Sequence, residues 1–285
     1  MKLPDFDYVS PSTLAEAIAL LAEGGPDARL IAGGQSLLPT MAYRLASPSL
    51  LVDLRRVAGL DRIEVDDRGV RLGATVRWRD IVDDARLAKA HPLLVEAINH
   101  VGHYQIRNRG TVGGSLAHAD SAAEMPGIAV ACDAELTLVG PSGSRVIRAN
   151  EFLLGPLSTA LAADEILVEV TLPPWPAARR WGFEEFSRRR GDFAIAGIAL
   201  YYDPDPDGRA RNVHIAVFGA SRFAHRLPEA EQAIEARMID ASAIKAAAGA
   251  AAGAVHPSDD LHASAAYRRS LVATLVERVL KRIAT

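Results

Sequence analysis

The segment IRNRGTVGGSLAHADSAAEMP, residues 106–126, gathers residue types that suit ligand binding. Arg107 and Arg109 precede the paired glycines Gly113 and Gly114, and small residues, a histidine and two carboxylates follow them. Glycine allows positive φ and lets a ligand approach the backbone. Successive amides in such turns form concave sites that bind phosphate oxygens. The segment therefore predicts a molecule bound close to its backbone.

A second glycine pair, Gly33-Gly34, lies in RLIAGGQSLLP and has similar flanks, an apolar segment before it and small polar residues after it. Two such turns from distant parts of the chain could grip one diphosphate; the alternative is two ordinary tight turns. The usual dinucleotide fingerprint G-x-G-x-x-G and the P-loop motif are both absent. The nucleophile elbow G-x-S-x-G is absent too. A diphosphate ligand held without these motifs points to a different class of flavin fold.

The histidines leave open a function of another class. The side chains of His100, His103, His118 and Asp120 could together form the metal site of a hydrolase. His100 and His103 would lie one turn apart on a helix, but no H-E-x-x-H motif supplies a general base. Capping or packing roles are the alternative interpretation, and we favour it.

Composition narrows the classes of function further. The chain has 285 residues, 49% of them apolar, and a formal charge of -3, which argues against a general nucleic-acid binder. Its longest basic run, Arg188-Arg189-Arg190, suits a solvated face or an anion contact. The single cysteine, Cys132, rules out a disulfide framework and an iron–sulfur cluster with four cysteine ligands. The sequence also lacks a signal peptide and an apolar run of the roughly 20 residues needed to span a membrane, so it predicts a cytoplasmic protein.

The elements that must position the glycine segments alternate between helices and strands. Helices are expected at residues 10–25, 92–103 and 122–132. Strand patterns occur at 28–32, running into the first glycine turn, and also at 49–57, 69–75 and 165–172, with a hairpin over 134–147. The stretch PPWPAARR, residues 173–180, is the candidate domain boundary because three prolines interrupt any continuous element.

Beyond the boundary the pattern changes to three strands and a helical tail. The strand-like runs are Trp181–Ser187, Ile195–Tyr202 and Val213–Phe218. Residues 241–254 and 262–283 predict helices, the second with an apolar stripe interpreted as core and made of Tyr267, Leu271, Leu275, Val279 and Ile283.

Four segments together resemble a known family. AGGQSLLP, IRNRGTVGGSLAHADSAAE, SRRRGDFAIAG and LHASAAYRRSLVATLVERVL are similar, in this order, to segments of the FAD-binding medium subunit of molybdenum hydroxylases, the family of xanthine dehydrogenase and aerobic carbon monoxide dehydrogenase. The resemblance runs almost from end to end. It implies an α+β fold: a two-part FAD-binding module of the vanillyl-alcohol-oxidase type over residues 1–175, split near 55–60, and a medium-subunit domain of three antiparallel strands and a helical bundle over 176–285.

The resemblance also implies which residues bind FAD. The first FAD loop would be formed by Leu30, Ile31, Ala32, Gly33, Gly34, Gln35, Ser36 and Leu37. The second would be formed by Thr111, Val112, Gly113, Gly114 and Ser115. Further cofactor contacts would come from Val101, Glu124, Leu167, Asp192 and Phe193, with the aromatic Phe193 able to cover the flavin ring. No catalytic residue and no metal ligand is implied, and no residue offers a covalent link, so noncovalent FAD is expected.

Two positions depart from the family pattern. Ser121 stands where the family often has proline, and an acid stands at Glu184 or Glu185 where the family often has lysine. The resemblance implies an electron-transfer subunit that passes electrons from an iron–sulfur partner through FAD to an acceptor such as NAD⁺, a quinone or oxygen. Molybdopterin and the 2Fe-2S clusters would lie on a large and a small partner subunit, expected to assemble as a dimer of heterotrimers. A self-sufficient flavin-dependent oxidoreductase is the alternative, and a metal-dependent hydrolase is the alternative of a different class.

Overall fold

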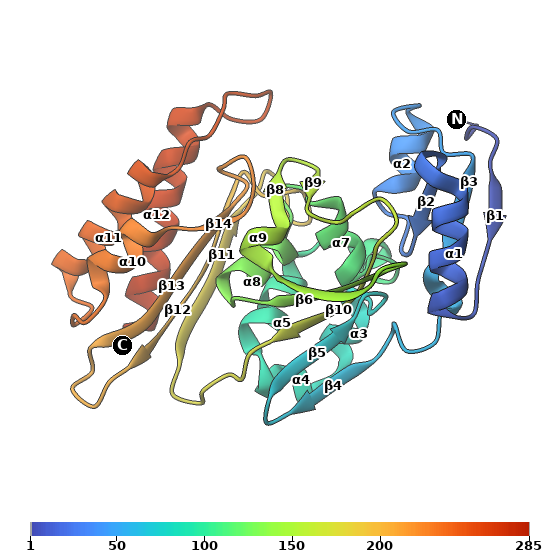
Figure 1. Ribbon diagram of the computed structural model, residues 1–285. Helices are drawn as coiled ribbons and strands as arrows, with labels where there is room; N and C mark the ends of the chain where they lie inside the picture. The colour runs from blue at the N-terminus through green and yellow to red at the C-terminus, as the bar shows by residue number, and fades with distance from the viewer. Residues whose placement is uncertain (1, 285) are drawn as a thin grey trace.

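The computed structural model describes residues 2–284, which form three consecutive layers of structure along the chain (Figure 1). The first layer is a small parallel sheet of strand order β1-β3-β2 with helices beside it. Thr13 caps the first helix by accepting a hydrogen bond from the Glu16 amide. The elements of this layer are β1 (Asp7–Val9), α1 (Leu14–Gly24), η1 (Gly25–Asp27), β2 (Ala28–Ile31), α2 (Leu37–Ala42), β3 (Leu50–Asp53) and η2 (Leu54–Arg56).

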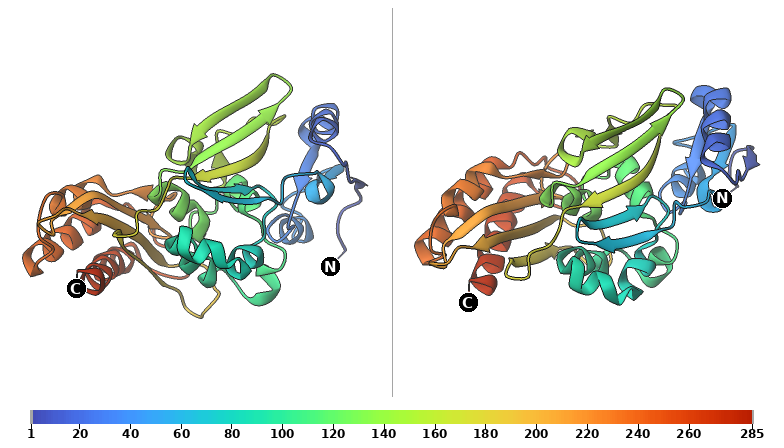
Figure 2. Two further views of the ribbon diagram at one scale, coloured as in Figure 1. Left: turned by 90° about the horizontal axis from the view of Figure 1, so that it is seen from below. Right: turned by 60° about the horizontal axis from the view of Figure 1, so that its bottom comes forward.

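The second layer is a five-stranded antiparallel sheet of order β4-β5-β10-β6-β7 with short helices packed against it (Figure 2). Its strands are β4 (Ile63–Asp66), β5 (Gly69–Gly73), β6 (Glu135–Gly140), β7 (Gly143–Arg148) and β10 (Ile166–Leu172), and β8 (Leu153–Gly155) pairs separately with β9 (Ser158–Thr159). Its helices are α3 (Trp78–Asp83), α4 (Ala85–Ala90), α5 (Pro92–His100), α6 (Tyr104–Arg107), α7 (Val112–His118), α8 (Glu124–Ala131) and α9 (Ala149–Phe152).

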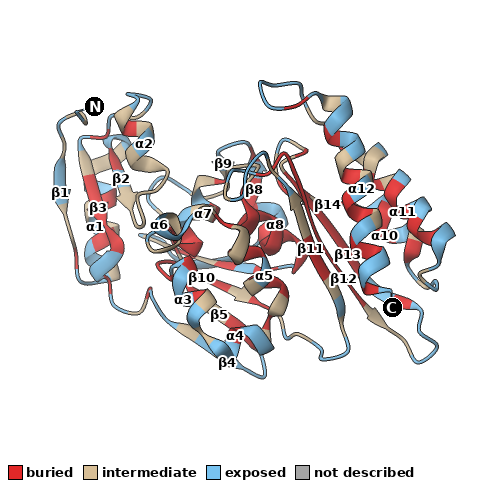
Figure 3. Ribbon diagram, turned by 180° about the vertical axis from the view of Figure 1, so that it is seen from behind, coloured by how far each residue is buried: buried red, intermediate tan, exposed pale blue. Residues whose placement is uncertain are grey.

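The third layer is an antiparallel sheet of order β11-β12-β13-β14 with two long helices over one face. Figure 3 shows the central strands as a buried band between α11 and α12 on one side and the second layer on the other. The elements are β11 (Arg180–Phe186), β12 (Ala196–Pro204), β13 (Ala210–Phe218), β14 (His225–Arg226), α10 (Pro228–Ile234), α11 (Ala241–Ala254) and α12 (Ala265–Ile283).

The second and third layers share one continuous core. The cluster that contains the buried helix α8 also includes Phe183 and Phe218 of the third sheet. Phe218 lies between two glycines: a Cβ at Gly127 would come within 2.7 Å of its ring, and one at Gly197 within 2.0 Å. The segment that joins the layers is anchored as well, because the Trp175 ring lies 5.3 Å from that of Tyr201. The joining segment therefore packs into the protein.

Two sequence interpretations need correction. Residues 112–118 form a helix that the glycine pair concealed, since glycine favours turns over helix interiors. The stripe on α12 is core at Leu275, Val279 and Ile283, but Tyr267 is 45% exposed and touches the Phe186 ring edge-on. Tyr267 lies in the first turn of the helix and is not among its buried residues. Among residues 2–284, no helix is both long enough and apolar enough to cross a membrane.

Candidate functional site

The two glycine segments meet in space, which joins the first layer to the second. Gly33 follows β2, and its Cα faces the backbone at the end of the IRNRG stretch. A Cβ at Gly33 would lie 2.1 Å from the Arg109 carbonyl oxygen and 2.9 Å from the Gly110 Cα. Contact between two backbones at this distance needs a residue without a side chain.

The first segment turns at Gly34 and then starts α2. Gly34 has φ of +71°, the left-handed conformation that glycine adopts without strain. The Gln35 side-chain amide donates to the Gly33 carbonyl at 3.0 Å and fixes the turn. The positive φ expected for this glycine pair therefore occurs at Gly34.

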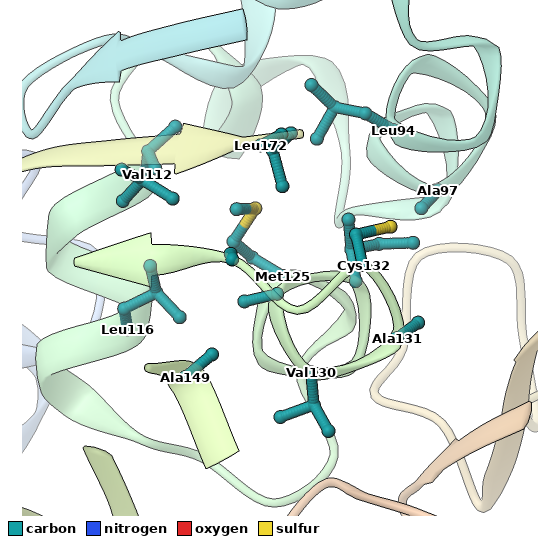
Figure 4. Packing of buried hydrophobic residues seen from close by; sticks show 14 of the residues in the cluster. Leu94, Ala97, Val112, Leu116, Met125, Val130, Ala131, Cys132, Ala149 and Leu172 are labelled. Carbon is teal, nitrogen blue, oxygen red and sulfur yellow. The ribbon is translucent and has the colours of Figure 1, made fainter. Parts of the chain in front are cut away.

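The second segment reaches the same place by a different geometry. Thr111 caps α7, its hydroxyl accepting a hydrogen bond from the Gly114 amide at 3.2 Å. Gly113 and Gly114 both lie inside this helix and neither has positive φ, so the expectation of a left-handed turn there was wrong. The helix forms because the cap and the buried Val112 and Leu116 stabilise it (Figure 4).

Adjacent positions on α7 carry two distinct requirements for glycine. A Cβ at Gly113 would lie 2.5 Å from the Ala74 Cβ, so this glycine lets the helix pack on the end of β5. A Cβ at Gly114 would meet the Thr111 hydroxyl at 2.7 Å and no other atom within 4 Å. Gly114 is exposed and its open side offers space that a ligand can fill.

A cavity of about 310 Å³ lies where the two segments meet. Ala32 and Gly33 line it from the first segment, and Arg109 and Thr111 line it from the second. Asn108 also lines the cavity, and its side-chain oxygen is buried without a hydrogen-bond partner among the described residues. A buried acceptor of this kind costs free energy unless a donor reaches it, so its position indicates a polar ligand.

Charged side chains surround the same cavity. Arg55, Arg77 and Arg109 supply positive charge, and Asp61 and Asp80 supply negative charge. Arg55 is held by the buried Asp53, whose carboxylate accepts from its Nε at 2.7 Å. The Asp80 carboxylate accepts from the Arg77 amide at 3.1 Å. Arg109 has no ion-pair partner among residues 2–284 and is free to meet an anionic group.

The other sequence-predicted cofactor contacts do not line this cavity. Val101 is the C-cap of α5, and its carbonyl accepts from the Arg107 guanidinium at 3.0 Å. Leu167 is buried in β10. Asp192 and Phe193 lie in the loop between β11 and β12 and line a second cavity of about 940 Å³. The structure thus brings the two loops together and places Asp192 and Phe193 at a separate hollow.

The second cavity lies between three loops of the third layer and the chain after α7. Phe193 is 61% exposed at its wall. Arg188 and Arg189 of the basic run line it, together with Arg222. Arg268, also in its lining, has a structural role, because its guanidinium donates to the carbonyls of Ile195 and Gly219 and pairs with Asp260. The basic run Arg188-Arg189-Arg190 is therefore exposed, and two of its three arginines line the second cavity.

Glu124 begins α8 and is only 4% exposed. Burial, and secondarily the charge of Glu185, raise the pKa of Glu124 to about 8. Glu185 lies near His100, with 3.5 Å between its carboxylate and the imidazole Nδ1. Glu124, Glu185 and the partly exposed His100 form a polar cluster that does not line the first cavity.

The histidines considered as metal ligands have other neighbours. His100 lies between Glu96 and Glu185, and His103 packs against Gly191, where a Cβ would lie 2.6 Å from its ring. Within residues 2–284, the His, Cys, Asp and Glu side chains form no group of three or more that could hold a metal ion.

Sequence reasoning missed Asn108, and it noted Glu185 only as one of two acids near a position where the family often has lysine. Asn108 lies between the two arginines of the RNRG stretch, and its polar side chain directly before a glycine segment was the available signal. Glu185 sits in β11 among alternating residues, where an acid at an inward position carries a signal only once the strand register is known.

Comparison with known proteins agrees with this geometry. Residues 4–175 match the family model described as the FAD binding domain in molybdopterin dehydrogenase, and residues 181–283 match the CO dehydrogenase flavoprotein C-terminal domain. The chain belongs to the FAD-binding medium subunits of molybdenum hydroxylases. Its FAD-binding and CO dehydrogenase flavoprotein domains account for the mixed fold of helices and antiparallel sheets.

Relatives within this family match over nearly their whole length. The chain is 42% identical over 280 residues to the 6-hydroxypseudooxynicotine dehydrogenase complex subunit alpha of Paenarthrobacter nicotinovorans, covering 98% of this chain and 95% of that one. It is 34% identical to the carbon monoxide dehydrogenase medium chain of Hydrogenophaga pseudoflava, covering 97% and 96%. These relatives are subunits of dehydrogenase complexes, and this chain is a medium subunit of the same kind.

Solved structures give the same assignment. Carbon monoxide dehydrogenase from Hydrogenophaga pseudoflava superposes with a TM-score of 0.96 at 35% identity, covering 99% of this chain and 98% of that one. Quinoline 2-oxidoreductase from Pseudomonas putida 86 superposes with a TM-score of 0.94 at 40% identity, covering 100% and 98%. The fold expected from the sequence, a FAD-binding module followed by a medium-subunit domain, is confirmed by these matches.

Proposed function

We propose that FAD binds noncovalently across the junction of the two glycine segments, with Ala32 to Ser36 and Thr111 to Ser115 around its diphosphate. The observation that carries this proposal is the convergence of Gly33 on Arg109 beside a cavity with an unpaired buried Asn108 oxygen. The open side of Gly114 supports it, because a ligand can approach the helix backbone there. Arg109 fits the anionic diphosphate, and the Asn108 oxygen, which needs a donor, fits a hydroxyl or amino group of the same cofactor.

The chain's own residues would bind and orient the cofactor. The exposed Arg109 can offset diphosphate charge, and the capped α7 holds the Gly114 backbone still. Val101, Glu124 and Leu167 remain proposed contacts further along the cofactor, and Asp192 and Phe193 remain proposed neighbours of its ring. Bound FAD supplies the chemistry, since a flavin accepts electrons singly or in pairs.

We infer that the chain passes electrons from a small iron–sulfur subunit to an external acceptor, while a large molybdopterin subunit oxidises the substrate. Its single cysteine supports this division, since a cluster needs about four ligands. A dimer of heterotrimers is the proposed assembly, with residues 1–175 as the FAD-binding domain and 176–285 as the medium-subunit domain. A cytoplasmic location stays a prediction from cysteine content.

The test uses the full chain with and without its partners. Purified alone, the chain should bind about one FAD per chain. An added one-electron reductant should reduce this FAD, yet the chain should turn over no aldehyde, purine or N-heterocycle. Flavin absorbance under anaerobic conditions is the measurement, before and after the small and large subunits are added. Substrate-dependent flavin reduction should appear only with both partners. Repeated substrate turnover by the lone chain would overturn the subunit function and favour a self-sufficient flavin oxidoreductase.

A further inference from the structure

Three titratable side chains gather where α5, α8 and β11 meet. Glu124 at the start of α8 is 4% exposed, and the side chain of Glu185 on β11 is also 4% exposed. His100, in the last turn of α5, is 35% exposed and so connects the cluster to solvent. The imidazole Nδ1 lies 3.5 Å from a Glu185 carboxylate oxygen. Its Nε2 lies 3.7 Å from the carboxylate of Glu96, which is half exposed.

Among residues 2–284, His100 is the cationic group that acts on the two buried carboxyls. Asp120 precedes α8 and adds negative charge, although its carboxylate accepts from the Ala122 amide. Arg278 and Arg282 of α12 pair with Glu184, the adjacent residue on β11. Successive strand residues point to opposite faces, so these arginines bind on the other side of the strand. The cation that faces Glu124 and Glu185 is the His100 imidazole.

Glu185 has one oxygen that the protein leaves unsatisfied. Its Oε1 faces His100, while its Oε2 is buried without a hydrogen-bond partner among the described residues. A buried unpaired oxygen is costly, and two ionised carboxylates beside one imidazolium would leave a net negative charge buried. A proton on Glu124 removes the net buried charge, because it neutralises one of the two acids.

We propose that Glu124 holds a proton and, with the buried Glu185 and the partly exposed His100 beside it, forms a proton-holding site at the junction of α5, α8 and β11. The directions of two pKa shifts agree with this proposal. Burial raises the pKa of Glu124, with the charge of Glu185 as the second cause. A hydrogen bond that the Glu185 carboxylate accepts from the imidazole raises the pKa of His100.

The role of this site rests on the proposed function, in which Glu124 contacts the cofactor. At a pH slightly above 8, where Glu124 is largely ionised, negative charge placed beside it favours uptake of one proton from solvent through the partly exposed His100. When that charge leaves, the proton returns to solvent. The only bond formed or broken on the protein is the carboxyl O–H bond, and no electron passes to the protein. Glu185 and His100 are thus positioning residues that keep the charge near the cofactor constant.

The proton-holding site can be tested in the chain without cofactor. Infrared spectroscopy of protein with ¹³C-labelled glutamate carboxyls reports whether a buried glutamic acid is protonated. At neutral pH the chain should show one carboxylic-acid band that disappears with a midpoint at about pH 8. Glu124→Gln should abolish that band. Glu185→Gln should make the remaining acid about tenfold more acidic or more, because a like charge is removed.

Controls separate the cluster from general effects on the fold. Glu184→Gln changes the neighbouring residue on the opposite face of β11 and should leave the midpoint unchanged. Circular dichroism confirms that each variant folds, and Glu185→Lys is a second variant that should remove the titration near pH 8 by supplying a fixed cation. Absence of the band in the unmodified chain, or an unchanged midpoint in Glu185→Gln, would overturn the proton-holding site.

A second measurement tests the role toward the cofactor. FAD content is measured first; failure to bind FAD would refute the proposed function and leave the infrared result standing. In FAD-loaded protein, proton uptake on anaerobic chemical reduction is then followed with a pH indicator in weak buffer slightly above pH 8. The unmodified chain should take up more protons per flavin than Glu185→Lys. Equal uptake in both would overturn the role beside the cofactor.

Discussion

Gly33 packs its Cα against the backbone carbonyl of Arg109, so closely that a Cβ at residue 33 would lie 2.1 Å from that oxygen. This contact joins a loop of the parallel sheet to the chain that leads into α7, across 76 residues of sequence. Both sides are backbone, so neither can move aside as a flexible side chain would. The contact therefore sets the width of the cavity in which FAD is proposed to bind.

Gly33→Ala should weaken FAD binding at least about tenfold and destabilise the fold by about 1–3 kcal/mol, the range for overpacking. The added methyl group pushes the first loop away from Arg109. Thermal unfolding and flavin titration are the measurements. Gly249→Ala is the matched control, since Gly249 lies in α11 with no atom within 4 Å of an added Cβ and should be stabilised by up to about 1 kcal/mol. Full FAD affinity in Gly33→Ala would show that the contact does not shape the site.

Neighbouring substitutions on α7 should have opposite consequences. Gly114→Ala should lose little stability, because the helix preference of alanine offsets the displacement of the Thr111 hydroxyl, which would lie 2.7 Å from the added Cβ. FAD binding should fall strongly, because the methyl group enters the proposed ligand space. Gly113→Ala should instead lower the melting temperature, because its Cβ would lie 2.5 Å from that of Ala74. Flavin content after gel filtration, with circular dichroism, distinguishes them. Normal FAD occupancy in Gly114→Ala would exclude a ligand at this face.

The sequence predicted the family, the main strands and the pairing of the two glycine segments better than it predicted local conformation. Gly34 has the positive φ that glycine pairs suggest, whereas Gly114 is helical, because the Thr111 cap outweighs the poor helix propensity of glycine. A glycine pair permits positive φ but does not require it, and the packing of Gly113 on Ala74 favours the helical conformation here. Glu185 was beyond reach for the same reason, since its burial depends on the register between β11 and β12.

Cys132 should be unreactive in the folded chain. It is fully buried behind α8, among the side chains shown in Figure 4, and burial raises the pKa of its thiol. A thiol reagent should modify less than one tenth of the native protein in the time that modifies all of it in denaturant. Cys132→Ala should retain FAD and cost about 1–2 kcal/mol, and Cys132→Ser should cost more because a hydroxyl would be buried there. Rapid modification of the native chain would contradict this packing.

His91 should make the protein sensitive to acid. The ring is fully buried, its Nδ1 accepts a hydrogen bond from the Leu94 amide at 3.3 Å, and burial lowers the pKa of His91 to about 3. Because Nδ1 accepts, the neutral ring carries its proton on Nε2, which is buried without a partner among residues 2–284. The neutral form is thus built into the N-cap of α5.

The sign of the pH effect follows from the two states of His91. The unfolded chain binds a proton on this residue below about pH 6.5, whereas the folded chain keeps it neutral down to about pH 3. The free energy of unfolding therefore decreases as the pH is lowered from about 6.5 to about 3. The slope from one such proton is at most about 1.4 kcal/mol per pH unit. His91→Asn keeps an acceptor for the cap and cannot be protonated, so its stability should fall less steeply between pH 6 and pH 4. Urea unfolding at several pH values gives the slope of the free energy of unfolding against pH for each protein. The difference between the two slopes reports on His91, because the contributions of the carboxylates are common to both proteins. Parallel slopes would mean that His91 is protonated in the folded chain.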